Sequence, residues 1–386
     1  MHGTMAAPHS PPPAGGSSAQ LRLQGIAAAR QALLAERRGA SPAWVPGWVE
    51  RSWQRCLAQG LQPEKEASFA TLSRPQMLRT LDANAHLVRT ARPLIESLGR
   101  AIVNTGYFAI LTNHEGVVVD VSGAIDRSDP RADLITRIGT DLSEHSVGTT
   151  AIGTALTELQ PVWLHRGEHF FTNTAVYSCA GAPVLGPDGR CAGMLDLTGI
   201  EVAERPELKH LVTQVAGKIE NALVLSQAHS LTLRLNWPGT PLGGDGDGIL
   251  CLDADGHITG ANPIARQMVP GLASGPAHVP VHASAVFGVA TDLLFDAAQR
   301  QSPMDVPLWN GLMLQCLALD RAFEAQPARM APRLGAGGAA QRAVPLKDLE
   351  AEMIQRAVQQ ARGNVAQAAQ ALGLSRATVY RKLQRK

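Results

Sequence analysis

The chain has 386 residues, of which 35 are basic and 33 acidic, so its formal net charge is only +2. A chain of this length is expected to form about two to four domains. Its five cysteines are an odd number without close paired spacing, which argues against a disulfide framework and a structural zinc site and predicts a reducing compartment. Because no apolar run could cross a bilayer and the start lacks the apolar core of a signal peptide, a cytoplasmic location is predicted.

The N-terminal part is predicted to be a polar tail followed by helices. Residues 1–19 are rich in Pro, Gly and Ser, a composition typical of disorder. Residues 20–100 are expected to be a helical region, with an aromatic-anchored helix in Trp44–Gly60 and a long amphipathic pattern in Ser73–Val103.

Residues 101–228 alternate hairpin and helix patterns, which predicts an α+β fold with an antiparallel sheet layered with helices. The runs Asn113–Gly116 and Gly186–Gly189 are turn signals that each separate two apolar, β-rich segments. Helices are expected at Ala151–Glu158 and from Pro206 to about Gln227. The strands expected at the two turns are Tyr107–Thr112, Val117–Val121, Gly181–Leu185 and Cys191–Leu197.

A second, smaller α+β unit is expected at residues 240–319. Gly248–Leu252 and His257–Gly260 are predicted strands on either side of a turn, and Asn262-Pro263 opens a helix that runs through Val269. The Pro-, Ala- and Gly-rich segment 326–345 is expected to be a flexible linker.

Residues 346–386 predict an all-α helix-turn-helix that binds double-stranded DNA. Gly363-Asn364 ends a first amphipathic helix and caps a second short helix, Val365–Leu372. Ser375 is a good N-cap for a third helix, Arg376–Gln384, which carries cations and no acidic residue. From Arg342 onward nine basic residues stand against three acidic ones, as in a tethered nucleic-acid binder. A dimer that reads a palindromic promoter or enhancer site in the major groove is expected. The residues predicted to contact bases or phosphates are Arg376, Thr378, Tyr380, Arg381, Lys382 and Arg385.

The segment from Asp141 to Gly199 carries a series of short motifs. They are Ser143-Glu144, Gly148–Thr154, Glu168-His169-Phe170, Cys179–Pro183 and Leu195-Asp196, preceded along the chain by Arg51–Cys56. With these motifs the segment closely resembles the GAF sensor domain of AcoR-like regulators of acetoin catabolism. The C-terminal helices resemble the Fis-type DNA-binding domain of those proteins, and Gly248–Val269 resembles part of a PAS domain. The resemblance implies a GAF-like sensor at 101–228, a PAS-like domain at 240–319 and a Fis-type domain at 346–386.

One module of that family is missing between the sensor and the DNA-binding end. AcoR-like activators normally carry an AAA+ ATPase there, which remodels polymerase bearing the sigma-54 type of factor. A phosphate-binding P-loop needs Gly-Lys followed by Ser or Thr, whereas Gly217-Lys218, the only such pair in the sequence, is followed by Ile219. The sequence therefore predicts a regulator that acts without an ATPase module.

The sensor domain is expected to bind a small-molecule effector in a mainly apolar cavity with a few polar groups. Two alternatives are a thiol enzyme, with Cys179 near His145, His169 and Glu168, and a metal or haem site at His145, His169 and Cys179. Neither spacing matches a known pattern, so no catalytic residue, metal or cofactor is predicted. The residues predicted to contact the effector are His145, Thr149, Trp163, His169, Phe170, Phe171, Tyr177 and Cys179.

Taken together, these features predict a non-enzymatic, homodimeric transcription regulator that acts with RNA polymerase or a related regulator. An adaptor that forms mixed dimers with an ATPase-bearing AcoR-like activator is the first alternative. A thiol enzyme in the sensor domain is the second.

Overall fold

The computed structural model of the protein describes residues 18–35, 44–272 and 281–320. Within these ranges the chain forms two five-stranded antiparallel sheets, each with helices packed on it, so the predicted α+β class is confirmed for this part. The predicted linker and all the predicted DNA-contacting residues lie outside the described residues. Helix α1 (Ser18–Arg30) begins within the last two residues of the predicted tail. Among the described helices, none is both long and apolar enough to cross a membrane.

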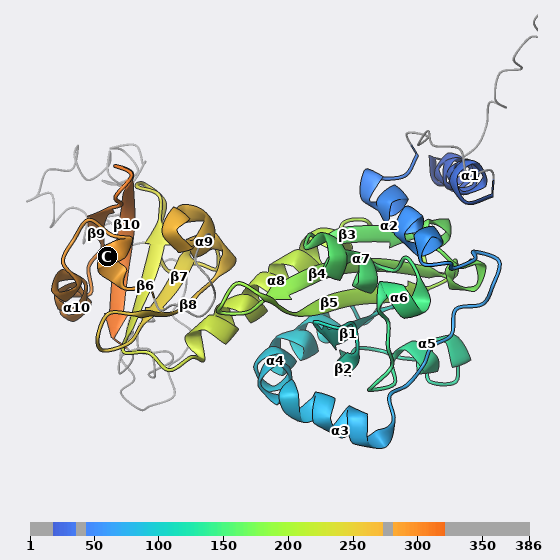
Figure 1. Cartoon of the computed structure of the whole chain (residues 1–386), viewed down its shortest axis with the longest axis horizontal. Helices are drawn as coiled ribbons and strands as arrows, with labels where there is room; N and C mark the ends of the chain where they lie inside the picture. Colours follow the sequence, from blue (N-terminus) through green and yellow to red (C-terminus); the bar gives the residue numbers. More distant parts are fainter. Residues whose placement is uncertain (1–17, 36–43, 273–280, 321–386) are drawn as a thin grey trace, which may run out of the picture. The chain divides into compact units, whose positions relative to one another are not determined.

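The first sheet has the strand order β2-β1-β5-β4-β3, and every neighbouring pair is antiparallel (Figure 1). Both predicted hairpins are confirmed, because β1 pairs with β2 and β4 pairs with β5 across the two predicted turns. The first and last strands, β1 and β5, lie side by side, with Ile110 opposite Asp196. The strands are β1 (Tyr107–Asn113), β2 (Val118–Ser122), β3 (Val162–His165), β4 (Tyr177–Leu185) and β5 (Cys191–Ile200).

Helices cover both faces of this sheet (Figure 1). The helices of this part of the chain are α2 (Gly47–Ala58), α3 (Arg74–Ala83), α4 (Ala85–Ala101), α5 (Pro130–Ile135), α6 (Glu144–Val147), α7 (Ala151–Glu158) and α8 (Leu208–Leu225), with short turns η1 (Gln31–Ala35), η2 (Arg166–Glu168) and η3 (Thr172–Thr174). α4 and α8 pack on one face, and α7 packs on the other. The long pattern predicted at Ser73–Val103 is broken at Asn84 into α3 and α4. The predicted bounds of α7 are confirmed.

The alternation of side chains along β5 divides the domain into two cores. Leu195 and Leu197 are buried against α4 and α8, whereas Met194 belongs to the core beneath α2 and α7. Successive side chains of a strand point to opposite faces, so Asp196 and Thr198 share the face of Met194.

The second sheet has the strand order β8-β7-β6-β10-β9. Its strands are β6 (Leu231–Asn236), β7 (Gly248–Leu252), β8 (Ile258–Ala261), β9 (Met304–Pro307) and β10 (Met313–Asp320), with helices α9 (Pro263–Met268) and α10 (Thr291–Arg300) and short turns η4 (Pro270–Leu272) and η5 (Ala283–Ala285). The predicted strands β7 and β8 and the helix after Asn262-Pro263 are confirmed. β6 precedes the range 240–319 predicted for this unit, and its Leu233 lies opposite Leu250 of β7 and Ala318 of β10. The likeness of this unit to a PAS domain stays a prediction.

Candidate sensor cavity

The motif residues Ser143-Glu144 and Gly148–Thr154 anchor helix α2 on the sensor domain. Arg55 of α2 donates to both carboxylate oxygens of Glu144, from Nε at 2.7 Å and from Nη2 at 2.9 Å. Ser52 Oγ donates to the same carboxylate at 2.7 Å and lies 2.7 Å from Oγ1 of Thr149. Glu144 is almost fully buried, so this charge depends on its partners.

Two glycines in these motifs allow the close packing. Gly153 lies on α7 directly against α6, where a Cβ atom would come within 2.5 Å of the backbone nitrogen of Glu144. Gly148 has φ of 65°, and a Cβ there would lie 2.9 Å from Cβ of Phe170. Both positions therefore require glycine for steric reasons.

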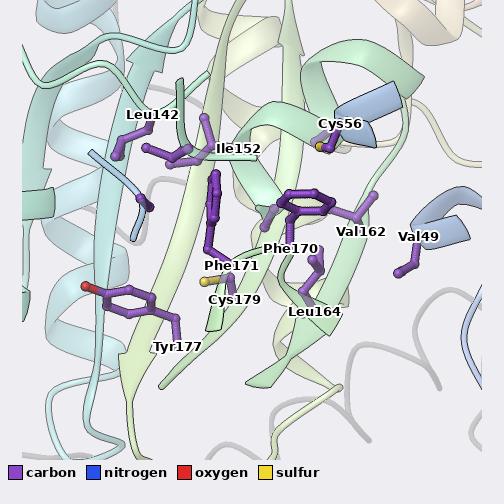
Figure 2. Close-up of a cluster of buried hydrophobic side chains, with 14 of the residues drawn as sticks. Val49, Cys56, Leu142, Ile152, Val162, Leu164, Phe170, Phe171, Tyr177 and Cys179 are labelled. Carbon is purple, nitrogen blue, oxygen red and sulfur yellow. The ribbon is translucent and has the colours of Figure 1, made fainter. Parts of the chain in front are cut away.

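A small cavity lies on the same face of the sheet, between its strands and the start of α7. It encloses about 30 Å³, which is room for about two water molecules. Its apolar lining comes from Phe69, Ile110, Ile135, Leu142, Ala151 and Ile152. Its polar lining comes from Thr150, His169, Thr174, Tyr177, Cys179, Asp196 and Thr198. Figure 2 shows Leu142, Ile152 of α7, and Tyr177 and Cys179 of β4 gathered in this core.

His169 lines this cavity and carries an unused hydrogen-bond acceptor. Its Nδ1 lies 2.9 Å from the carbonyl oxygen of Arg166 and must carry the proton, because a carbonyl oxygen only accepts. Its Nε2 is buried and has no hydrogen-bond partner. Burial lowers the pKa of the imidazole to about 4, so the ring is neutral near pH 7 and Nε2 offers a lone pair.

Asp196 presents the second unused polar atom. The Oδ2 atom accepts a hydrogen bond from Oγ1 of Thr198, while the Oδ1 atom is buried and unpartnered. Burial raises the pKa of this carboxyl group to about 7, because no protein cation compensates its charge. A large share of the molecules therefore carries a protonated Asp196 near neutral pH, and a protonated carboxyl can donate.

Cys179 lines the same cavity as a neutral thiol. Its Sγ is 3.3 Å from Oγ1 of Thr198, and burial raises the pKa of the thiol well above its usual range. A thiolate is the species that attacks or binds a metal, so this environment disfavours both roles. Among the described residues, the only group of three or more potential ligands close enough for a metal is Asp253, Asp255 and His257. His145, His169 and Cys179 thus do not converge on a metal site.

The residues predicted to contact an effector are distributed over several places. His169, Tyr177 and Cys179 line the cavity. Phe170 and Phe171 pack edge to face, with ring centroids 5.1 Å apart, in the core beside it (Figure 2).

The other three lie apart from the cavity lining. Thr149 belongs to the network that holds α2, and the side chain of His145 is exposed on α6. Trp163 is part of the core on the opposite face of the sheet, where its Nε1 donates to Glu204 at 3.3 Å.

Asp196 and Thr198 were not among the predicted contacts, although Leu195-Asp196 was one of the recognised motifs. A carboxylate inside the apolar strand Cys191–Leu197 was the available signal. Phe69, Ile135 and Leu142 come from loops and a short helix that sequence patterning did not place near the sheet.

Residues Arg166–Phe170, called the wall segment below, include the cavity-lining His169 and are hydrogen-bonded to helices α1 and α2. Arg30 of α1 donates to the carbonyl oxygens of Gly167 and Phe170, each at 2.9 Å, and to that of His169. Trp53 Nε1 of α2 donates to the carbonyl oxygen of Glu168 at 3.0 Å.

Two features of the wall segment lower the stability of the folded state. Arg166 adopts φ of 48°, a conformation that costs a non-glycine residue about 1 kcal/mol or more. Burial raises the pKa of Glu168 to about 7 even though Arg22 lies 3.1 Å away, since Arg22 is partly exposed and offsets only part of the desolvation. The contacts from α1 and α2 therefore stabilise a strained segment.

Two family models match the chain. The model described as "MimR, N-terminal domain" matches residues 26–221, and that described as "Bacterial regulatory protein, Fis family" matches residues 345–385. The second match covers nearly the whole range predicted to bind DNA.

Curated relatives match between about half and two thirds of the chain. The acetoin catabolism regulatory protein of Cupriavidus necator is 30% identical over 261 residues, which are 64% of this chain and 37% of that protein. The Bacillus subtilis acetoin dehydrogenase operon transcriptional activator AcoR is 26% identical over 57% of this chain and 36% of its own length. The propane 2-monooxygenase operon transcriptional activator MimR of Mycolicibacterium goodii is 27% identical over 52% and 35%. The chain thus spans little more than a third of the length of these relatives.

Solved structures give a more distant likeness. The Escherichia coli DhaR(N)-DhaL complex matches with a TM-score of 0.44 and 12% identity, covering 71% of this chain and 99% of that chain. The Pseudomonas aeruginosa HmgR structure matches with a TM-score of 0.27 and 18% identity over 55% of this chain and 99% of that chain.

Proposed function

The chain belongs to the family of transcription regulators with a MimR N-terminal domain and carries a Fis-type helix-turn-helix sequence, and on this premise we propose that it binds specific DNA sites under the control of a small-molecule effector. The effector occupies the cavity of the first sheet domain. The domain of the second sheet transmits the change or contributes to dimerisation. The protein acts as a regulator and not as an enzyme.

The observation that carries the sensing role is the pair of unpartnered polar atoms in the cavity. Buried polar groups in folded proteins nearly always have a hydrogen-bond partner. His169 Nε2 and Asp196 Oδ1 both lack one, and both residues line the same cavity. Two such residues in one cavity indicate a ligand that satisfies their open atoms.

The size and the walls of the cavity suggest how effector binding is transmitted to helices α1 and α2. Since the cavity is small, an effector must move its walls, and the segment Arg166–Phe170 is one of them. This segment is bonded to α1 through Arg30 and to α2 through Trp53. A ligand shifts this equilibrium only by the difference in its affinity for the two arrangements. We therefore expect occupied and empty cavities to differ in how firmly α1 and α2 are docked.

The DNA-binding role is tested by two substitutions in the helix-turn-helix. Arg376→Ala should weaken specific binding more than non-specific binding, because this residue is expected at the base edges. Lys382→Ala should weaken both alike and reduce the salt slope of binding by about one, because a phosphate contact carries no sequence information. Fluorescence anisotropy with an operator duplex and a scrambled duplex, over a range of salt concentrations, measures both effects. Equal losses on the two duplexes for Arg376→Ala would reject its assigned role.

The operator itself comes from occupancy of the full chain on sheared genomic DNA. Enrichment at a few palindromic sites supports a sequence-specific regulator. Diffuse, salt-sensitive binding alone would overturn it.

An adaptor role is the second candidate, because residues 321–344 alone separate the second sheet from the Fis-type match and the chain has no P-loop sequence. Such a chain could enter mixed dimers with an ATPase-bearing relative. Co-purification with such a relative in the absence of DNA, together with loss of specific DNA binding by the chain alone, would favour the adaptor over the independent regulator.

A further inference from the structure

The second sheet domain contacts the first domain at helix α8. Val224 of α8 packs with Ile249 and Cys251 of β7 in a small separate core. Asn221 of α8 is nearly buried, and its Oδ1 accepts a hydrogen bond of 2.8 Å from Nδ2 of Asn262. Both sheets lie within one compact unit of the chain. Helix α8 therefore provides one point of attachment between them.

The turn between β4 and β5 provides a second point of attachment. The carbonyl oxygen of Pro187 accepts a hydrogen bond of 3.0 Å from the backbone N–H of Ala261 and one of 2.6 Å from Nη2 of Arg266. The packing is close, because a Cβ atom at Gly260 of β8 would lie 3.0 Å from Cβ of Pro187. A Cβ atom at Gly189 of the turn would lie 2.9 Å from Nε of Arg266. The turn is thus docked on β8 and α9.

The side chain of Arg266 binds the turn and its own domain at once. Besides Pro187, its guanidinium group donates to the carbonyl oxygens of Ala261 at 3.3 Å and of Leu272 at 3.0 Å. One planar group thus connects three backbone segments, which a lysine could not do with the same geometry. Burial lowers the pKa of this guanidinium, so the group is partly withdrawn from water and depends on these acceptors.

The turn and the cavity are parts of one hairpin. Strands β4 and β5 pair along nearly their whole length, with one irregularity between Val184 and Leu185. The strand from Cys179 to Leu185 spans roughly 20 Å. Rigid, hydrogen-bonded elements carry displacements between distant sites, so a movement at the cavity reaches the turn. The cavity-lining residues of the hairpin are Tyr177, Cys179, Asp196 and Thr198.

We propose that the β4–β5 hairpin transmits the state of the cavity to the second sheet domain, and that Arg266 is the positioning residue that makes this connection. This inference rests on the proposed sensing function and names the path by which the signal leaves the first domain. The second sheet domain is held at α8 and at the turn, so a shift of the turn relative to α8 reorients it. Without Arg266 the attachment at α8 remains, and the domain no longer follows the hairpin.

A substitution that fills the cavity tests this path in the absence of an effector. Ile152 of α7 lines the cavity, and Ile152→Phe displaces its walls because the added volume does not fit. The backbone N–H of Ala261, which donates to Pro187, reports on the attachment of the turn. Amide hydrogen exchange of the full chain, followed by mass spectrometry, should differ about fivefold at Ala261 between the wild type and Ile152→Phe, the change expected for one weakened hydrogen bond.

Removal of the guanidinium should abolish this response. In Arg266→Met we expect exchange at Ala261 to rise, and the addition of Ile152→Phe should then change it by less than about twofold, as for uncoupled sites. Arg300→Met is the matched control, because Arg300 is exposed on α10, and it should keep the full response. Arg266→Lys keeps the cation with fewer donors and should give an intermediate response, which tests the same contact with a milder change. Thermal unfolding of each variant verifies that it is folded.

The outcomes separate this path from the wider function. An equal response of Ala261 to Ile152→Phe with and without Arg266 would overturn the proposal, because α8 would then carry the signal alone. An unchanged Ala261 in Ile152→Phe, while exchange in residues 166–170 of the cavity wall changes, would overturn it as well. The exchange measurement requires no DNA. Loss of specific DNA occupancy by the wild type would therefore contradict the proposed function, whereas loss of the exchange response contradicts only the path.

Discussion

Replacing Asp196 by asparagine is expected to change how the stability of the sensor domain depends on pH. Burial raises the pKa of this carboxyl group from 3.8 to about 7 in the folded protein. Between about pH 4 and pH 7 the folded state therefore holds a proton that the unfolded chain has released. The free energy of unfolding falls with rising pH wherever the folded state binds more protons than the unfolded state. The stabilising contribution of the protonated Asp196 is therefore lost above a pH of about 7. A shift of about three units corresponds to about 4 kcal/mol in total.

Urea unfolding of the full chain, followed through the fluorescence of the buried Trp53 and Trp163, measures this effect. From about pH 5 to about pH 7 the wild type should lose about 2 kcal/mol of unfolding free energy relative to Asp196→Asn. Titration of other groups, such as His169, contributes to both proteins and largely cancels in the difference. Asp188→Asn serves as the control, because that side chain is exposed on the β4–β5 turn. A difference that stays constant over this range would mean that Asp196 is ionised in the folded protein at pH 5, and the reasoning from its burial would be refuted.

The remaining predictions concern the packing around the cavity. Arg55→Met leaves the buried carboxylate of Glu144 without its ion-pair partner and should lower the free energy of unfolding by about 3 kcal/mol, measured by urea denaturation; a loss under about 1 kcal/mol would show that water replaces the guanidinium. Gly153→Ala should cost about 1–3 kcal/mol because its Cβ meets the backbone of α6, whereas Gly217→Ala in α8, where nothing lies within 4 Å, should stabilise by about 0.5–1 kcal/mol. Equal effects of the two alanines would contradict the steric argument. Arg30→Met removes the donors to the wall segment and should accelerate amide hydrogen exchange in residues 166–170 by about tenfold or more, and unchanged exchange there would show that α1 does not hold this wall.

Much of the sensor fold was predictable because its signals are local. The turn sequences at Asn113–Gly116 and Gly186–Gly189 require particular backbone conformations, and each formed the hairpin expected of it. Helix α7 (Ala151–Glu158) is preceded by the N-cap Thr150, whose side chain accepts a hydrogen bond from the backbone N–H of Gly153, and a capping residue before an apolar run is a sequence signal.

The strand β6 was not predicted although a local signal was present. Leu231–Asn236 alternates leucine with polar residues, which is a pattern typical of a strand. What the sequence did not show is its partners, because β7 and β10 follow it along the chain and β10 lies some 80 residues further on.

The candidate site likewise combines features that are local in the sequence with features that depend on tertiary packing. The residue types of the motifs, the alternation of β5 and the lack of a P-loop lysine can be read from the chain alone, since these depend on chemistry and spacing. The fold was needed to show that Trp163 and Cys179 face opposite sides of one sheet, and that His169 and Asp196, each with one buried unpartnered atom, line the same cavity. The reason is physical. A strand's period fixes which residues share a face, but the elements that pack on that face decide whether it becomes solid core or a space for a ligand.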